Sequence, residues 1–417
     1  MARTKAALGA GMRLTDYLGA SLLARVVPAE IVNEVLDAHG CNSQRLRSFP
    51  AVAGVYYCMA LSLYPEAAYE EVFAVVSQGL AWASGAAEPA RVAKSSISGL
   101  RSRIGAQPLK DLVQRCCLPL AQQATHPEAF YAGLRLVALD GSCFELADED
   151  DNVATFGRPG SRTGYSAYPQ ARSAILVECA SHAILGANLD AYRTPEWEVC
   201  KPLLASLKPD MLCLADRGFD GFEYWRQARE SGAQLLWRAM KDRKLPVLRQ
   251  LDDGSYISAI CPTQMTRAEA TRQAIEVRVV EYSLPGVPSP AGHDKPELRY
   301  RLLTSLLDDK LAPAHELAAL YHQRWHIEGV FDEMKTHLLA GRRVLRSKTA
   351  ELVKQEFYGW VLAHYAVRWL LHQGASRHPE PLATRSFTAH LQLLRRAQPR
   401  SGAFPPRARK KTPALVQ

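Results

Sequence analysis

Two aspartates, Asp140 and Asp216, each end a short apolar run and each precede a glycine-containing turn. Asp140 stands in the sequence ALDGS, and Asp216 stands in LADRGFDG. A carboxylate at the end of a strand is held by the sheet yet faces an open edge, which suits the binding of a metal ion. The alternative is that each aspartate only forms a turn, because Asp before Gly or Arg-Gly is a common turn sequence. The two aspartates alone do not decide between these roles.

A third group of ionisable residues lies far along the chain, in the sequence YHQRWHIEGVFDEMK. Tyr321, Arg324, Glu328 and Lys335 stand at offsets 0, 3, 7 and 14, which at 100° per residue fall within an arc of about 60° on one helix face. The alternative is an ordinary helix in which Arg324 and Glu328 form an i, i+4 ion pair of a few tenths of a kcal/mol. That alternative leaves Tyr321 and Lys335 unexplained.

Two strand-end aspartates and one helix glutamate would form a site with oxygen ligands only. Hard cations such as Mg²⁺ or Mn²⁺ prefer such ligands. Two such ions about 4 Å apart activate a water or hydroxyl and stabilise the leaving oxygen in phosphoryl transfer. The combination of Asp140, Asp216 and Glu328 therefore predicts metal-dependent chemistry on a phosphodiester.

The elements that must position these residues can be read from the apolar pattern. The chain is predicted to be helical from residue 14 to about residue 125, including a buried apolar helix at Ala51–Leu63, and the residue pattern then changes. Four strands are predicted next, with one helix before the fourth strand and one after it. This order indicates a mixed α/β sheet. The strands are Leu134–Asp140, Ala171–Ala180, His182–Tyr192 and Asp210–Asp216, and the helices are Trp197–Leu207 and Gly221–Ser231.

In the following segments apolar and polar residues alternate as they do in strands. The chain is then predicted to be helical again between Glu316 and Gln373. A basic tail without acidic residues after Glu380 follows, and such tails usually stay mobile and bind polyanions. The predicted domains are a helical N-terminal domain with DNA contacts (1–128), a catalytic core in two parts (129–236 and 304–375), a β-rich insertion between them (237–303) and the basic tail (376–417).

Composition limits the class of protein. The 417 residues are 47% hydrophobic and 22% charged, which excludes disorder throughout. The nine cysteines include no CxxC pair, which argues against a zinc module and a disulfide framework. The sequence shows neither a signal peptide nor a membrane-spanning run, so we expect a soluble cytoplasmic protein.

The net charge of +9 is unevenly distributed. Residues 131–236 carry −5, whereas residues 307–417 carry +9. An acidic middle beside a basic end suits an enzyme that gathers carboxylates around cations and holds a polyanion with its flanks. In the helix at Ser96–Ile104, Arg101 and Arg103 either face solvent or contact DNA.

At the ionisable residues above, the sequence resembles the DDE transposases of the bacterial insertion-sequence-four family. The family signature, Tyr–two residues–Arg–three residues–Glu–six residues–Lys, is complete here from Tyr321 to Lys335. The stretch ALDGS…FGRPGSRTGYSAYPQAR around the first aspartate and LADRGFDGFEYW around the second are typical of the family. LTDYLGASLLARVVPAEIVNEVL resembles its helical N-terminal domain, and the whole resemblance runs from about residue 12 to about residue 372.

The resemblance implies a catalytic core of ribonuclease-H-like fold, interrupted by a β-rich insertion between the second aspartate and the glutamate. It implies that Asp140, Asp216 and Glu328 are the catalytic triad and bind Mg²⁺ or Mn²⁺, with two ions in the site. His182 and His326 carry no role in this scheme, and we expect them to be structural or hydrogen-bonding residues.

The remaining signature residues are implied to bind DNA. Arg324 and Lys335 would hold phosphates near the cleaved end, and Tyr321 would hydrogen-bond a backbone phosphate. Some relatives use an aromatic residue of the insertion to stack on a flipped end base. Tyr300, with Trp237 as a rival, is the candidate for that role here, and core packing is the alternative for both.

The resemblance also implies a reaction and its partners. Family members cut double-stranded DNA at inverted-repeat ends by hydrolysis, form a hairpin that is reopened, and join the ends to target DNA. A homodimer would pair the two ends, and the protein would work in the bacterial cytoplasm, associated with the nucleoid. Two alternatives remain: a catalytically silent DNA-binding protein descended from a transposase, and a metal-dependent nuclease that cuts without joining.

Overall fold

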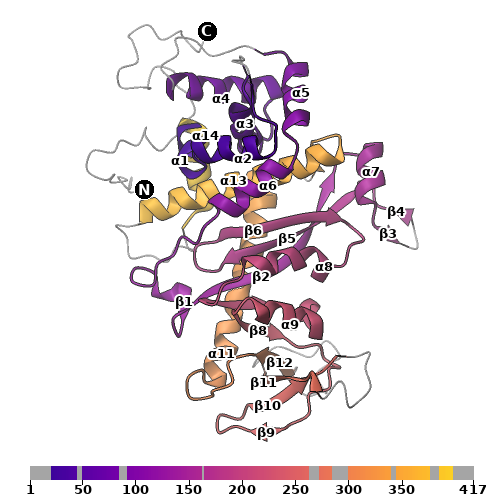
Figure 1. The fold of residues 1–417 in the computed structure, drawn as a ribbon, viewed down its shortest axis with the longest axis vertical. Coiled ribbons are helices and arrows are strands. Elements are labelled where there is room, and N and C mark those ends of the chain that lie inside the picture. The colour runs from indigo at the N-terminus through magenta and orange to yellow at the C-terminus, as the bar shows by residue number, and fades with distance from the viewer. Residues whose placement is uncertain are drawn as a thin grey trace.

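Five strands from the middle of the chain form the part of the sheet that carries the two aspartates (Figure 1). They are β2 (Leu134–Leu146), β5 (Gln170–Glu178), β6 (Ala183–Ala191), β7 (Met211–Ala215) and β8 (Gln234–Arg238). In the computed structural model their order is β6-β5-β2-β7-β8. β5 is antiparallel to β2 and β6, whereas β7 runs parallel to β2 and β8 runs parallel to β7. This is the topology of a ribonuclease-H-like sheet, which confirms the predicted fold class.

The structure describes residues 20–44, 49–83, 92–161, 164–262, 272–283, 299–339, 344–375 and 385–397. Around the sheet, the predicted strands and helices of residues 134–231 are all present, with two differences. β2 continues past Asp140 to Leu146. The first predicted helix is a short α-helix, α8 (Glu196–Cys200), that continues as a 3₁₀ segment, η3 (Lys201–Ser206), because Pro202 provides no N–H for an α-helical hydrogen bond. The second is α9 (Phe222–Glu230).

The predicted insertion extends the core sheet. Its strands are β9 (Arg249–Gln250), β10 (Tyr256–Ile260), β11 (Ile275–Ser283) and β12 (Arg299–Thr304). β12 pairs with β8, with Leu303 opposite Trp237, and the sheet continues through β11 and β10 to β9. The predicted boundary at residue 237 therefore falls inside a core strand. The insertion strands lie at the far end of the molecule from the N-terminal helices (Figure 1).

The region predicted as one helical stretch from 316 to 373 is divided in two. The first part runs without a break through α11 (Ala314–Tyr321), a 3₁₀ segment η5 (His322–Trp325), α12 (His326–Asp332) and a π-helical segment η6 (Glu333–Leu338). A short strand, β13 (Val344–Leu345), then pairs with the end of β2 before α13 (Ala350–Ala375) begins. Within the predicted tail, residues 387–397 form helix α14 (Phe387–Ala397), and most of the remaining tail lies outside the described residues.

Helices form the N-terminal region, as predicted (Figure 1). The apolar helix α3 (Ala51–Leu63) is buried along its length and crosses α13 so closely that a Cβ on Gly359 would lie 2.6 Å from the Cys58 carbonyl oxygen. Arg101 is also buried, and its guanidinium donates to the Gln355 side chain at 2.9 Å, so both predictions for this arginine are wrong. The other helices are α1 (Ala20–Val26), α2 (Ala29–Ala38), α4 (Tyr69–Ala83), α5 (Lys94–Ile104) and α6 (Gln107–Cys116).

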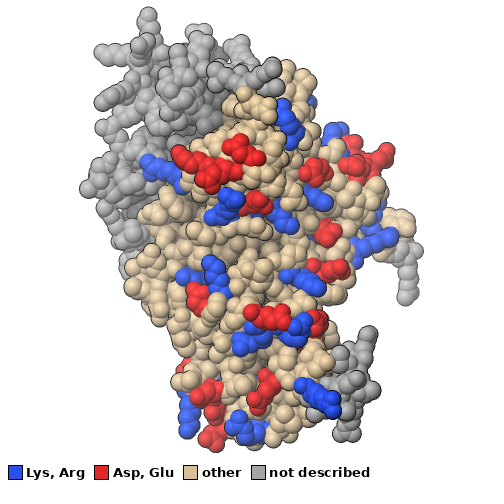
Figure 2. Space-filling model, viewed as in Figure 1, with Lys and Arg blue, Asp and Glu red and all other residues tan. Residues whose placement is uncertain are grey.

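Charged side chains of both signs are interspersed over the face drawn in Figure 2. On that face the described residues form no single basic patch. Among the helices that the structure describes, none is long and apolar enough to cross a membrane.

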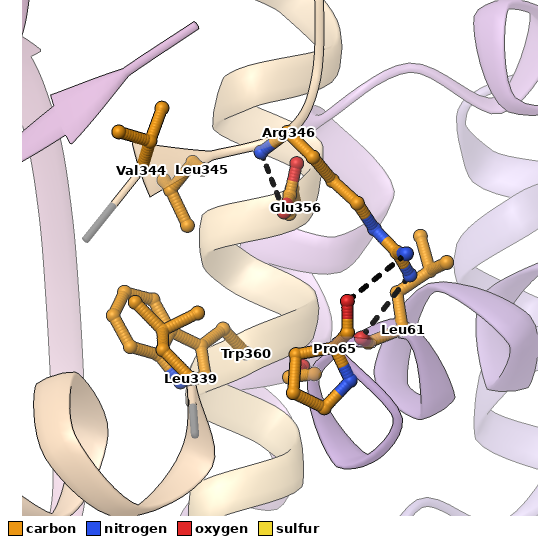
Figure 3. A pocket seen from close by; sticks show the side chains of 9 residues that line it. Leu61, Pro65, Leu339, Val344, Leu345, Arg346, Glu356 and Trp360 are labelled. Atoms are coloured by element: carbon orange, nitrogen blue, oxygen red, sulfur yellow. Dashed lines mark hydrogen bonds between the residues drawn. The ribbon is translucent and has the colours of Figure 1, made fainter. Parts of the chain in front are cut away.

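Arg346 joins the N-terminal helices to the core (Figure 3). Its guanidinium donates to the carbonyl oxygens of Leu61 at 3.3 Å and Pro65 at 3.4 Å, at the end of α3 where helix carbonyls lack partners. Its backbone N–H donates to Glu356 of α13 at 3.3 Å. These contacts surround a small cavity lined by Leu339 and Trp360, so the joint between the two regions is a packed structural contact.

Candidate active site

Strand register places the two aspartates side by side. β2 and β7 are parallel, and Leu139 lies opposite Ala215, so the next residues on each strand, Asp140 and Asp216, reach the same edge of the sheet together. Asp216 also begins a short 3₁₀ segment, η4 (Arg217–Phe219), and its carboxylate accepts the Gly218 N–H at 2.6 Å. Asp216 therefore has both predicted features: it forms a turn, and it lies at the edge of the candidate site.

Asp140 lies in an environment that resists its ionisation. Burial raises the pKa of its carboxyl to about 7, and the negative charges of Glu196 and Asp216 act in the same direction. The Gly141 N–H, which donates to Asp140 Oδ1 at 2.9 Å, and the Arg324 guanidinium act in the opposite direction. A bound cation would strongly favour the ionised form of an acid whose pKa is near neutrality.

Arg324 connects the helix that carries Glu328 to Asp140. The Arg324 guanidinium donates to Asp140 Oδ2 at 3.0 Å and to Glu328 Oε1 at 3.4 Å. Arg324 itself is nearly buried, with 12% of its side chain exposed, whereas 47% of the Glu328 side chain is exposed. A single guanidinium therefore bridges the first and third acids of the predicted triad.

The two ends of the predicted signature also contact the core strands. The Tyr321 hydroxyl donates to the carbonyl oxygen of Ala215 at 3.2 Å, directly before Asp216. Lys335 donates to Ser142 Oγ at 2.5 Å, and burial lowers the pKa of its ammonium group. The segment is not one ideal α-helix, because 3₁₀ and π-helical turns alter its pitch. Tyr321, Arg324 and Lys335 nevertheless contact β2 or β7, and Glu328 is joined to them through Arg324.

The donor set is suited to a hard divalent cation, because it consists of carboxylate oxygens. In the part of the chain that the structure describes, no three His, Cys, Asp or Glu side chains converge closely enough to hold a metal ion. The Arg324 bridge accounts for part of this spacing, since its guanidinium lies between Asp140 and Glu328. The residues that would hold the ion are thus present at one edge, with an arginine between two of them.

The two candidate stacking aromatics differ sharply. Trp237 on β8 is fully buried, with its ring 5.0 Å from the Trp225 ring and 5.6 Å from the Tyr224 ring, so it is a core residue and has no face for a base. Tyr300 on β12 is partly exposed. Its ring stacks on Tyr282 at 5.4 Å.

A groove of about 380 Å³ lies between β11 and α11. Tyr282, which stacks on Tyr300, is among its lining residues, together with His322 of the helix that carries the signature. Of the two candidates, Tyr300 is therefore the one whose neighbour Tyr282 lines an open surface.

Sequence analysis missed Glu196, whose carboxylate lies beside Asp140 and Asp216. Its only signal was an acid in the first turn of a short helix, and acids are common there for reasons unrelated to metal binding. The contacts of Glu333, a buried residue of the helical segment that carries Glu328, were not predicted either.

Glu333 binds residues that come from three parts of the chain. It pairs with Arg368, and accepts hydrogen bonds from His182 at 2.9 Å and His364 at 2.8 Å. His182 in turn lies 3.0 Å from His326, ring nitrogen to ring nitrogen. The prediction that His182 and His326 are structural or hydrogen-bonding residues is confirmed.

Comparison with known proteins identifies two matching families. The family described as transposase DDE domain matches residues 131–366, and the family described as insertion element 4 transposase N-terminal matches residues 18–114. The first contains both aspartates and the signature helix, and the second contains α1 to α5 and most of α6.

Two curated relatives come from Escherichia coli (strain K12). The transposase InsG for insertion sequence element IS4 is 26% identical over 282 residues, which cover 67% of this chain and 61% of the relative. The putative transposase InsZ is 24% identical over 219 residues, which cover 52% of this chain and 70% of the relative. The chain thus matches less than two thirds of the length of InsG.

Among solved structures, the chain is similar to a piggyBac transposase synaptic complex with hairpin DNA. The likeness has a TM-score of 0.44 and 9% sequence identity, and it covers 90% of this chain and 79% of the other. A likeness this distant supports no conclusion about the chain.

Proposed function

We propose, because this chain belongs to the transposase DDE domain family, that it is a metal-dependent transposase acting on the ends of an insertion sequence. The observation that carries the proposal is the register of β2 against β7. It places Asp140 and Asp216 at one edge, where Arg324 of the facing helix joins Asp140 to Glu328.

The proposed triad is Asp140, Asp216 and Glu328, whose oxygens would hold Mg²⁺ or Mn²⁺ as a pair of ions. Bound there, the ions would activate the attacking water or hydroxyl and stabilise the leaving oxygen. Ionised Asp140 is required for this, so the environment that raises its pKa ties activity to pH. The exposure of Glu328 leaves its carboxylate accessible from the site edge.

Three further residues would hold the DNA backbone. Arg324, now paired with two carboxylates, would turn its guanidinium to a phosphate once those carboxylates hold a cation. Lys335 of η6 donates to Ser142, two residues beyond Asp140 on β2, where a phosphate next to the scissile bond could reach its ammonium group. Tyr321 would have to exchange its hydrogen bond to Ala215 for one to phosphate.

The proposed reaction is cut-and-paste transposition. The enzyme would hydrolyse one strand at each inverted-repeat end, form and reopen a hairpin, and transfer the ends to target DNA. Tyr300 would stack on the flipped base beside the groove between β11 and α11. A homodimer would hold the two ends together, because each end needs an active site.

A cleavage assay tests this proposal. Purified protein is incubated with its flanking inverted-repeat ends and Mg²⁺ or Mn²⁺, as wild type, Glu328→Gln and the control Asp332→Asn. Asp332 is exposed on the same helix one turn further on, so its variant shares the location without the proposed role.

Hairpin-ended products from wild type and Asp332→Asn, but not from Glu328→Gln, support the transposase. Tight binding of the ends without cleavage in either metal would favour the catalytically silent DNA-binding protein. Nicked ends that never join to target DNA would favour a nuclease.

A further inference from the structure

His182 occupies the tight turn between β5 and β6 with an unusual backbone conformation. Its φ is +59°, and among the described non-glycine residues only Ala132 shares a positive φ. The left-handed region is disfavoured for a residue with a Cβ, and Gly or Asn commonly fills it. Backbone strain of this kind persists only where the surrounding structure holds the residue in place, and here the imidazole is the buried group that is held.

The imidazole of His182 lies against the turn of α12 that carries Glu328. Its Nε2 lies 3.0 Å from His326 Nδ1, and the two rings meet edge-on with their centroids 5.2 Å apart. A Cβ on Gly329 would lie 3.2 Å from His182 Cε1, so the absence of a side chain there lets the ring approach the helix closely. His326 precedes Glu328 by two residues, and Gly329 follows it directly. His182 thus contacts the helix on both sides of this glutamate.

The opposite side of the ring is fixed by buried charged groups. His182 Nδ1 lies 2.9 Å from Glu333 Oε1 and 2.6 Å from a guanidinium nitrogen of Arg368. Burial holds the pKa of His182 well below its usual value, and the positive charge of Arg368 acts in the same direction, so the ring is neutral at neutral pH. A neutral ring that donates to Glu333 from Nδ1 accepts at Nε2, so His326 is the donor in their hydrogen bond. The orientation of the ring is therefore set at both nitrogens.

Burial of α12 does not require this contact. Ile327 and Val330 are fully buried and already hold the helix on the core. Apolar packing has little directional preference, whereas a hydrogen bond has a preferred direction and therefore resists rotation of the helix about its axis. Among the described residues, the carboxylate of Glu328 has one hydrogen bond, at 3.4 Å to Arg324 of the same helical segment. The direction of Glu328 therefore depends on what holds the turn from beneath.

We propose that His182 is a positioning residue for Glu328: from the tip of the turn between β5 and β6, it fixes the rotation of α12 that presents this carboxylate at the site edge. The inference rests on the proposed function for the role of Glu328. It accounts for a histidine in a left-handed turn position and for the glycine at Gly329, two features that core packing alone leaves unexplained.

Hydrogen exchange of the full-length protein without metal or DNA tests the inference independently of activity. The variant is His182→Asn, because Asn tolerates the left-handed backbone and can still donate to Glu333 but is too short to reach His326. The control is His364→Asn, which removes a hydrogen bond to the same Glu333 from α13. We expect the amides of residues 326–332 to exchange about tenfold faster in His182→Asn, and at close to the wild-type rate in His364→Asn.

Cleavage of the inverted-repeat ends with Mn²⁺ measures the consequence for the reaction. We expect His182→Asn to lower kcat about 10- to 100-fold, as loss of a group that orients a metal ligand does, with the KM for end DNA close to that of wild type. We expect His364→Asn to keep a kcat close to that of wild type. A residue that only stabilised the fold would lower the melting temperature without this difference between kcat and KM.

The outcomes separate this inference from the proposed function. Wild-type exchange in α12 together with wild-type kcat in His182→Asn would overturn the role of His182 and leave that of Glu328 unchanged. Equal losses of kcat in His182→Asn and His364→Asn would also overturn it, because the effect would then come from the buried network as a whole. Absence of cleavage by wild type would overturn the proposed function, whereas faster exchange confined to α12 would still support the hold of His182 on this turn.

A second variant tests the contact from its other side. His326→Ala removes the partner of His182 at a partly exposed position, so it should fold even if His182→Asn does not. We expect it to lower kcat as His182→Asn does, and we expect the double variant to lose no more than either single variant. In the Glu328→Gln background, His182→Asn should have little further effect on the residual cleavage. Additive losses in either double variant would overturn the proposed coupling.

Discussion

Two glutamates five residues apart on one helical segment show how differently the same side chain is used. Glu328 has 47% of its side chain exposed and one long contact, 3.4 Å, to Arg324. Glu333 has 8% exposed, and its two oxygens are occupied by Arg368, His182 and His364. The carboxylate of Glu333 has all of its partners within the protein, whereas the carboxylate of Glu328 can still accept further ligands.

The difference between the two glutamates indicates which carboxylates are available for chemistry. A buried carboxylate whose partners are all provided by the fold stabilises a geometry, and removing it leaves those partners without a counter-charge. An exposed carboxylate such as that of Glu328 is hydrated, and its oxygens stay accessible to a ligand from outside the protein, such as a cation. Residues five apart on a helix lie on different faces, and here Glu333 is buried while Glu328 is exposed.

The largest effect on stability should come from Glu333. We expect Glu333→Gln to lower the free energy of unfolding by about 3–5 kcal/mol, because Arg368 would keep a buried charge without its partner. Thermal and urea unfolding measure this, with Asp332→Asn on the same segment as the control. The double variant Glu333→Gln with Arg368→Met should recover part of the loss, and no recovery would contradict the stated cause.

Glu328→Gln should show the opposite pattern. We expect about a 100- to 1000-fold loss of end cleavage, comparable with removal of one essential stabilising group, and a melting temperature close to that of wild type. Its ion pair is exposed and long, so little stability depends on it. A large drop in melting temperature for Glu328→Gln would show that the two glutamates do not differ as described.

The two regions should also respond to pH in opposite directions. Burial raises the pKa of Asp140 to about 7, so its contribution to stability is full below about pH 4 and is lost as pH rises toward 7. Burial lowers the pKa of His364 to about 3, so its contribution is full above about pH 6.5 and is lost as pH falls toward 3.

Melting temperatures measured across this range without metal check these signs. Asp140→Asn should gain stability relative to wild type above pH 7 and little at pH 4. His364→Gln should flatten the loss of stability below pH 6.5. A gain for Asp140→Asn that is equal at both pH values would contradict the proposed ionisation.

The sequence predicted the core sheet because its strands are short apolar runs with a period that can be read directly, and β7 is buried at every position. It predicted the signature residues from their spacing. It did not predict the contacts of Glu333, because its partners come from segments distant in sequence: Glu333 meets His182 and Arg368 only in the folded chain. Arg101 was misjudged for the same reason, since a basic residue on a short helix gives no sign of Gln355.

The smallest effect is expected for two aromatic residues of the sheet, one buried and one partly exposed. Trp237 is packed on several sides by the core, whereas Tyr300 is partly exposed beside the groove. We expect Tyr300→Ala to weaken the complex with flipped-end DNA by about 1–3 kcal/mol. We expect only a small fall in melting temperature, because the Tyr300 ring is partly exposed although it contacts Tyr282 and Arg238. Binding to end DNA with and without the terminal base measures this, with Tyr165→Ala, an exposed tyrosine on another part of the chain, as the control. Equal losses on both DNA forms would show that Tyr300 contacts the backbone, and a large fall in melting temperature would place it with Trp237 among the core residues.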